Sequence, residues 1–144
     1  MFNLPTEDRL SSWAEFRARL EDSTEPLTDV FEYWHTAPFV AYNNKIDPYN
    51  QRSWPTPWEI IVHNKYDEFT KALMIAYSIK CTRKFADSPV EIRTLVDSKL
   101  NRLYNVVSVD HEWAVNYGDV GVIHVDELPM DFLIENIIEV TRPR

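Results

Sequence analysis

Residues 53–80 read SWPTPWEIIVHNKYDEFTKALMIAYSIK, and this stretch decides the expected fold. Thr56 can cap a helix, Pro57 suits the first helical position, and Glu59 stands three residues after the cap, where its carboxylate can accept the cap amide. A helix is therefore predicted to begin at Pro57. It should be short, because Asn64 interrupts the apolar run that follows.

A second helix is predicted from about Tyr66 to about Lys84. Its apolar residues cover nearly every side rather than one stripe, which is typical of a helix buried in the centre of a domain. The residues that show this are Phe69, Ala72, Leu73, Met74, Ile75, Ala76, Tyr77 and Ile79.

After the breaker at 87–89 the pattern changes to the period-two alternation of half-buried antiparallel strands. Tyr104, Val106 and Ser108 are expected on one face of the sheet, with the residues between them on the other. The predicted strands are 91–96, 103–109, 113–117 and 120–125, with turns at 110–112 and 118–119. Residues 130–140 fit either a short helix or an edge strand.

The N-terminal part predicts two further helices and a long aromatic connection. Ser12 with Glu15 resembles a cap for the first helix, and the second is expected at 27–34. Residues 35–55 form a connection of a length that is uncommon unless it binds a partner or packs on itself. We therefore expect one α+β domain over 1–144, with the N-terminal helices and aromatic loop in 1–52 and the central helix packed on an antiparallel sheet in 53–142.

Composition excludes several classes of function. The formal net charge of −8 disfavours nucleic acid and acidic membranes as partners. Only two glycines occur, so phosphate-cradling loops are not expected, and the single Cys81 supports neither a disulfide nor a zinc framework. No apolar run is long enough for a membrane span. We expect a soluble chain without a cofactor or metal.

The helix-start motif and the order of elements resemble the bacterial transglutaminase-like cysteine peptidases over roughly residues 53–120. In that family the buried helix opens on a cysteine, and a histidine and an acid follow on neighbouring strands. The resemblance places the nucleophile position on Tyr66 or Asp67, the histidine position near Tyr104 and the acid position near Asn116. All three roles would then be vacant, as in a pseudoenzyme. The residues that carry the resemblance are Trp54, Thr56, Pro57 and Glu59, followed by Tyr66-Asp67-Glu68-Phe69.

The Trp-Pro-Thr-Pro-Trp-Glu segment also resembles small proteins of marine tailed phages. Together the two resemblances imply a non-catalytic binding or assembly protein, located in a virion or in the cytoplasm of the host cell. A protein partner is expected, and a homo-oligomer or larger assembly is compatible with the sequence. The candidate interface residues are Trp34, Phe39, Tyr42, Tyr49 and Trp54, because Trp and Tyr anchor interfaces well. Packing of these rings on the chain's own core is the competing explanation.

Two other functions stay open. The first is an enzyme, either a hydrolase that uses Asp67, Glu68 and His111 or a peptidase that uses Cys81. The second is a small acidic inhibitor that captures a host protein through the aromatic loop.

Overall fold

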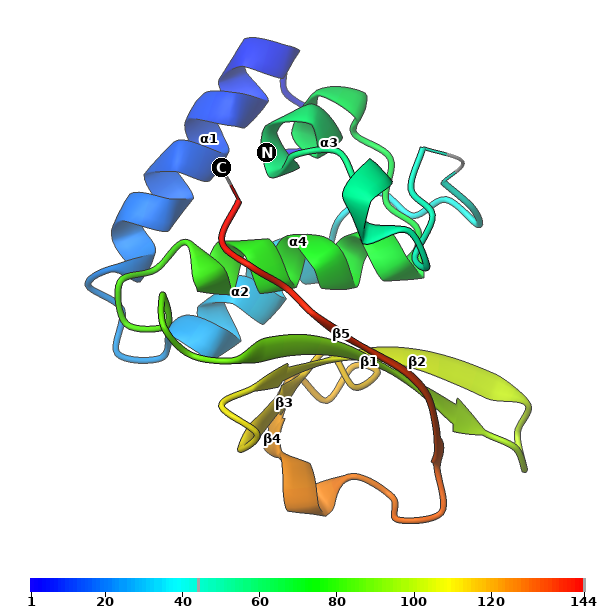
Figure 1. The fold of residues 1–144 in the computed structure, drawn as a ribbon. Coiled ribbons are helices and arrows are strands. Elements are labelled where there is room, and N and C mark those ends of the chain that lie inside the picture. Colours follow the sequence, from blue (N-terminus) through cyan, green and yellow to red (C-terminus); the bar gives the residue numbers. More distant parts are fainter. Residues whose placement is uncertain (44, 144) are drawn as a thin grey trace.

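The computed structural model describes residues 1–43 and 45–143, in which four α-helices precede an antiparallel sheet of five strands. Figure 1 shows the helices on one side of the sheet, with α4 lying nearest to it. The predicted α+β class is confirmed at this level. The helices are α1 (Thr6–Leu20), α2 (Pro26–His35), α3 (Pro57–His63) and α4 (Glu68–Lys80), with a 3-10 turn η1 (Gln51–Ser53) before α3. The strands are β1 (Val90–Asp97), β2 (Arg102–Val109), β3 (Trp113–Val115), β4 (Val122–His124) and β5 (Leu133–Glu139), with a 3-10 turn η2 (Val125–Glu127) after β4.

The capping box at the start of α3 is confirmed. The Glu59 amide donates to Thr56 Oγ1 at 3.2 Å, and the Thr56 amide donates to Glu59 Oε1 at 3.0 Å. The helix ends at Asn64, whose φ of 55° lies in the left-handed region that asparagine tolerates better than most residues. The predicted interruption therefore lies where the sequence places it.

The central helix α4 is shorter than predicted. It begins at Glu68, because Asp67 adopts an extended conformation and accepts the Thr70 amide as the N-cap. It ends at Lys80, before the turns that precede β1. From Ala72 to Lys80 every residue of α4 is buried, which confirms the expectation of a helix covered on all sides.

The first helix begins earlier than the Ser12 cap predicted. It starts at Thr6, directly after Pro5, and two acidic residues occupy its first turn, where the helix dipole favours negative charge. Ser12 instead lies within the helix, and its hydroxyl is 3.3 Å from that of Tyr33. The second helix agrees with its prediction within one residue at each end.

The sheet has the order β4-β3-β2-β1-β5, and all neighbours are antiparallel. The sequence of residues 130–140 fits either a short helix or an edge strand. The structure shows the strand, β5, which pairs with β1 at the edge of the sheet. Residues 125–132 connect the two edges. In Figure 1 this segment passes on the side of the sheet away from α4.

The predicted alternation in β2 is confirmed. Val107 and Val109 belong to the main core with the helices, whereas Val106 and Tyr104 belong to a second apolar cluster on the outer face. Phe132, from the connecting segment, stacks on Tyr104 with ring centroids 5.5 Å apart. Both faces of the sheet are thus partly covered, one by helices and the other by a strand-to-strand connection.

A single hydroxyl joins three helices in the middle of the helical layer. The indole N–H groups of Trp13 in α1 and Trp34 in α2 both donate to Ser78 Oγ in α4, at 3.2 and 3.0 Å. Ser78 Oγ in turn donates to the Met74 carbonyl at 2.8 Å. A hydroxyl has one donor and two acceptor sites, so this group is fully used. Both indoles and the serine are completely buried.

We predict that Ser78→Ala lowers the free energy of unfolding by about 2–4 kcal/mol, because it leaves two buried indole donors without an acceptor. Chemical denaturation of the variant measures this. Ser11→Ala is the matched control, since Ser11 is an exposed serine on α1. Equal stability of the two variants would contradict the role assigned to Ser78.

Candidate binding surfaces

The two residues at the expected nucleophile position have structural partners. Tyr66 is completely buried, and its ring lies 5.5 Å from the rings of Phe2 and Trp34. Burial raises the pKa of its phenol well above the ordinary value. Asp67 Oδ1 accepts the Thr70 amide at 2.7 Å as a helix cap. Both residues therefore serve packing and capping at the start of α4.

The structure does not bring the expected triad positions, Tyr66 or Asp67, Tyr104 and Asn116, together in one groove. Tyr66 belongs to the main core, and Tyr104 belongs to the cluster on the outer face of the sheet. The reason is the alternation of β2, which turns Tyr104 away from the helices. Asn116 has a left-handed φ of 74°, and its Nδ2 donates to the Asn105 carbonyl at 3.0 Å.

The hydrolase set Asp67, Glu68 and His111 is also divided. His111 lies in the turn between β2 and β3, and the preceding amide of Asp110 donates to the Pro89 carbonyl just before β1. This hydrogen bond places the turn beside the chain that follows the C-terminal end of α4. Asp67 and Glu68 lie at the N-terminal end of the same helix. A helix of this length spans about 20 Å. His111 Nδ1 is instead 3.6 Å from Glu91 Oε1.

Cys81 caps the C-terminal end of α4 and is half-buried. Burial raises the pKa of its thiol by more than the positive charges of Arg17 and Arg142 lower it. A helix C-terminus also disfavours a thiolate, because the helix dipole is negative there. Burial and the position at a helix C-terminus thus disfavour the thiolate that a nucleophilic cysteine requires, although two arginines lie nearby.

Within the described residues no three His, Cys, Asp or Glu side chains gather as a metal site requires. Among the helices of this part of the chain, none has both the length and the apolar character needed to cross a membrane.

The aromatic interface candidates divide into buried and exposed rings. Trp34 was predicted as an interface residue, but its side chain has no exposed surface and lies in the core. Trp54 is half-buried, with its ring 5.4 Å from that of Phe69, and its Nε1 donates to the Asp47 carbonyl at 2.7 Å. Trp34 and Trp54 therefore pack on the chain's own core, which is the competing explanation given above. The rings of Phe39, Tyr42 and Tyr49 are exposed, while Asn44 of the same segment lies outside the described residues.

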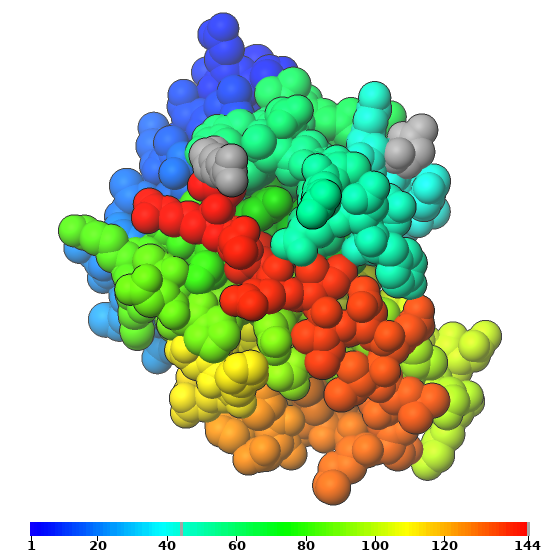
Figure 2. All heavy atoms as spheres, in the orientation of Figure 1, coloured from blue at the N-terminus to red at the C-terminus, as the bar shows by residue number. Residues whose placement is uncertain are grey.

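The strand β5 presents apolar side chains to solvent along the open edge of the sheet. Leu133, Ile134 and Ile137 are 61, 58 and 46% exposed. Tyr49 lies beside this strand, because its hydroxyl donates to Glu135 Oε1 at 2.9 Å. We call these four residues, Tyr49, Leu133, Ile134 and Ile137, the β5 edge surface. Figure 2 shows residues 46–55 and the strand side by side on one face of the molecule.

Sequence reasoning found only Tyr49 of this surface. The run Leu133–Ile134 and Ile137–Ile138 carries an apolar signal, but it also fits a helix, and nothing local shows that the strand lies at an edge. That position follows from pairing with β1, about forty residues earlier in the chain.

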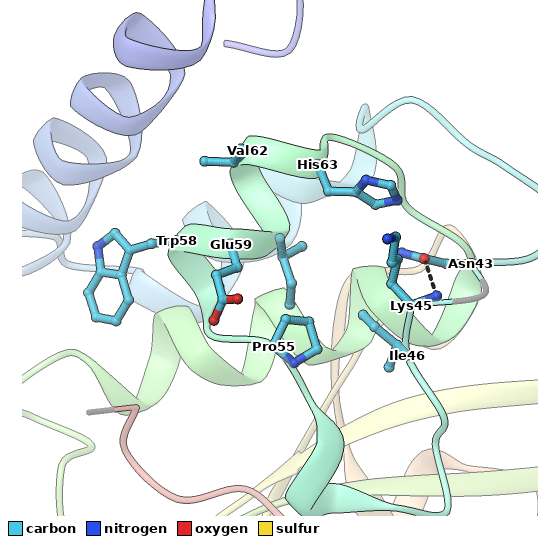
Figure 3. Close-up of a pocket in the computed structure, with 9 residues that line it drawn as sticks. Asn43, Lys45, Ile46, Pro55, Trp58, Glu59, Val62 and His63 are labelled. Carbon is cyan, nitrogen blue, oxygen red and sulfur yellow. Dashed lines mark hydrogen bonds between the residues drawn. The ribbon is translucent and has the colours of Figure 1, made fainter.

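A separate pocket of about 590 Å³ lies between α3 and the segment that precedes it. Figure 3 shows its lining, which combines apolar side chains with a lysine and a histidine at one end. The lining residues are Asn43, Lys45, Ile46, Pro55, Trp58, Glu59, Ile60, Val62 and His63. Its size lies within the range of pockets that bind small organic molecules.

Comparisons of this chain with protein-family models, curated proteins and solved structures gave no match. The resemblance to transglutaminase-like peptidases and to phage proteins therefore stays a prediction.

We predict that the Cys81 thiol of the folded chain reacts with iodoacetamide at neutral pH at least about tenfold more slowly than the same thiol after unfolding, because burial raises its pKa and so lowers its thiolate fraction. Mass spectrometry of alkylated protein over time measures the two rates. Faster alkylation in the folded state would instead support the peptidase alternative.

Proposed function

We propose that this chain is a non-catalytic binding protein that receives a β-strand of a protein partner along β5. The observation that carries the proposal is the open edge strand with three exposed apolar side chains, Leu133, Ile134 and Ile137. Addition of a strand to an exposed sheet edge is a common mode of peptide recognition, in which the backbone provides affinity and alternate side chains provide specificity.

The edge of β5 is protected against pairing only in part, by a register shift between Ile134 and Asn136 and by the loop that reaches its last residue. Natural edge strands are commonly blunted by lysine, proline or a covering segment. β5 contains neither lysine nor proline. Gln51 Nε2 donates to the Glu139 carbonyl at 2.9 Å, so the loop reaches the last residue of the strand. Leu133 and Ile134, at the other end, stay largely exposed.

The backbone groups of Ile137 point away from β1, on the side where the strand and the loop before α3 line a hollow of about 300 Å³. The Glu139 carbonyl faces away from β1, since it accepts Gln51, whereas the next amide, that of Val140, donates to Val90. Directions alternate along an antiparallel strand, so Ile137 shares the outward direction of Glu139. Its N–H and C=O can therefore form the first hydrogen bonds to an added strand.

Charge favours a basic partner over a second copy. Glu135 and Glu139 are exposed on β5, and the formal net charge of the chain is −8. Two copies repel each other, and two β5 strands carry only acidic charges to the interface. A partner strand in which apolar residues alternate with lysine or arginine would complement both the side chains and the charge.

The non-catalytic part of the proposal is supported by the separation of the expected triad positions in the fold and by the structural roles of the residues there. Tyr66 packs in the core, Asp67 caps α4 and Asn116 holds a backbone carbonyl. A transglutaminase-like origin is supported only by the order of elements, a capped helix and a buried helix followed by antiparallel strands. A role in phage assembly and a role in capture of a host protein both agree with an acidic strand-accepting edge.

Ile137→Lys is predicted to weaken partner binding by about tenfold or more, because it places a charge on the contact face of the added strand. Immobilised wild-type chain would select a partner from host extract, and calorimetry with the purified partner would then give the dissociation constant of each variant.

Val120→Lys is the matched control, since Val120 is 61% exposed but lies between β3 and β4 rather than on β5. It should bind as the wild type does. Equal binding of both variants, or a stable dimer of the chain alone that Ile137→Lys abolishes, would overturn the proposal of a basic partner strand on this edge. Circular dichroism of each variant checks that the fold is kept.

A further inference from the structure

The pocket between α3 and the described residues 43 and 45–55 has an apolar floor and walls. Ile46 and Ile60 are almost completely buried, and Trp58 adds an aromatic wall. None of the residues that line it belongs to the β5 edge surface. Its volume of about 590 Å³ suits a small organic ligand.

Basic side chains lie at one end of this pocket. Lys45 and His63 line it, and Lys65 follows two residues after His63. In the part of the chain that the structure describes, none of the three forms an ion pair with an acidic side chain.

The one acid on the lining is held elsewhere. Glu59 Oε1 accepts the Thr56 amide at 3.0 Å in the capping box, and this bond holds the pKa of Glu59 below its usual range. Figure 3 shows the Glu59 carboxylate turned away from Lys45 and His63. The charged end of the pocket is therefore open to an anion from outside the chain.

Asn43 holds the lysine-bearing segment in place before any ligand arrives. Its Oδ1 accepts the Lys45 amide at 3.0 Å, and its Nδ2 donates to the Lys65 carbonyl at 3.1 Å. Its own amide donates to Asp67 Oδ2 at 3.1 Å, which connects the segment to the cap of α4. Preorganisation of this kind lowers the entropy lost on binding.

We propose that this pocket binds a small organic carboxylate with an aromatic or branched apolar body. The carboxylate lies between Lys45 and His63, and the body packs against Ile46 and Ile60. Lysine provides the point charge, histidine provides a ring N–H, and the buried walls exclude water from the apolar part of the ligand.

Binding should depend on pH through His63. In the free protein, burial lowers the pKa of His63, and the charges of Lys65 and Lys45 lower it further, while Glu59 is held by Thr56. A bound carboxylate stabilises the imidazolium and raises that pKa. The complex then holds more protons than the free protein, so affinity increases as pH falls from about 7 towards 5, where a carboxylate is still largely ionised.

Calorimetry with naphthalene-2-carboxylate tests this proposal, with the neutral naphthalene-2-carboxamide as the matched probe. We expect the acid to bind about tenfold or more tightly than the amide at about pH 6. Lys45→Met should abolish this preference, because it keeps the apolar stem and removes the charge. Lys84→Met, on the connection between α4 and β1, should leave it unchanged.

His63→Gln should remove the pH dependence while keeping part of the affinity, a result that a purely structural role of His63 would not give. Equal binding of acid and amide, or no binding of either at millimolar concentration, would overturn the proposal. Ile137→Lys should bind the acid as the wild type does, so the result is independent of the partner proposed for β5.

Discussion

The hydroxyl of Ser78 is the contact on which the helical layer depends. Two indoles from different helices donate to it, and it donates onward to its own helix. These partners are 65 and 44 residues away from it in the chain. An apolar residue at this position would leave two buried donors unpaired, and a larger polar residue would need space that the surrounding core does not provide. The geometry therefore specifies how α1 and α2 lie on α4.

The position of α4 determines which surfaces remain for function. It covers the inner face of β1 and β2, and the segment 125–132 covers part of the outer face. The chain returns from that segment to add β5 beside β1, where only one side of the strand can be paired. Val140 then enters the core and fixes the end of β5, while its beginning remains exposed. An open edge on a rigid base is suited to binding another strand.

The sequence predicts those features that depend on neighbouring residues. The capping box of Thr56 and Glu59, the interruption of the helix at Asn64 and the alternation of β2 need only a few residues each, and all three agree with the structure. The start of α1 was missed because Pro5 and the acids after it gave an equally good signal earlier in the chain.

Features that depend on distant pairing were not predictable in the same way. The edge position of β5 requires knowledge of its partner, and the pocket requires Asn43, Lys45 and Ile46 to return to α3. Trp34 is buried because its indole N–H has an acceptor in α4. The local sequence does not show this acceptor, so Trp34 was predicted at an interface. The resemblance to a catalytic scaffold implied that Tyr104 faces the helices. The alternation of β2 places it on the opposite face of the sheet.

The most direct measurement for the central claim, that β5 is an open edge which a partner strand completes, is hydrogen exchange of individual backbone amides. In the free chain the Ile137 amide should exchange rapidly, while those of Ile92 and Val107 in the middle of the sheet should exchange only through global unfolding. Addition of the partner should slow exchange at Ile137 by about a hundredfold or more. An Ile137 amide already as protected as the central strands in the free monomer, and unchanged by the partner, would contradict the account.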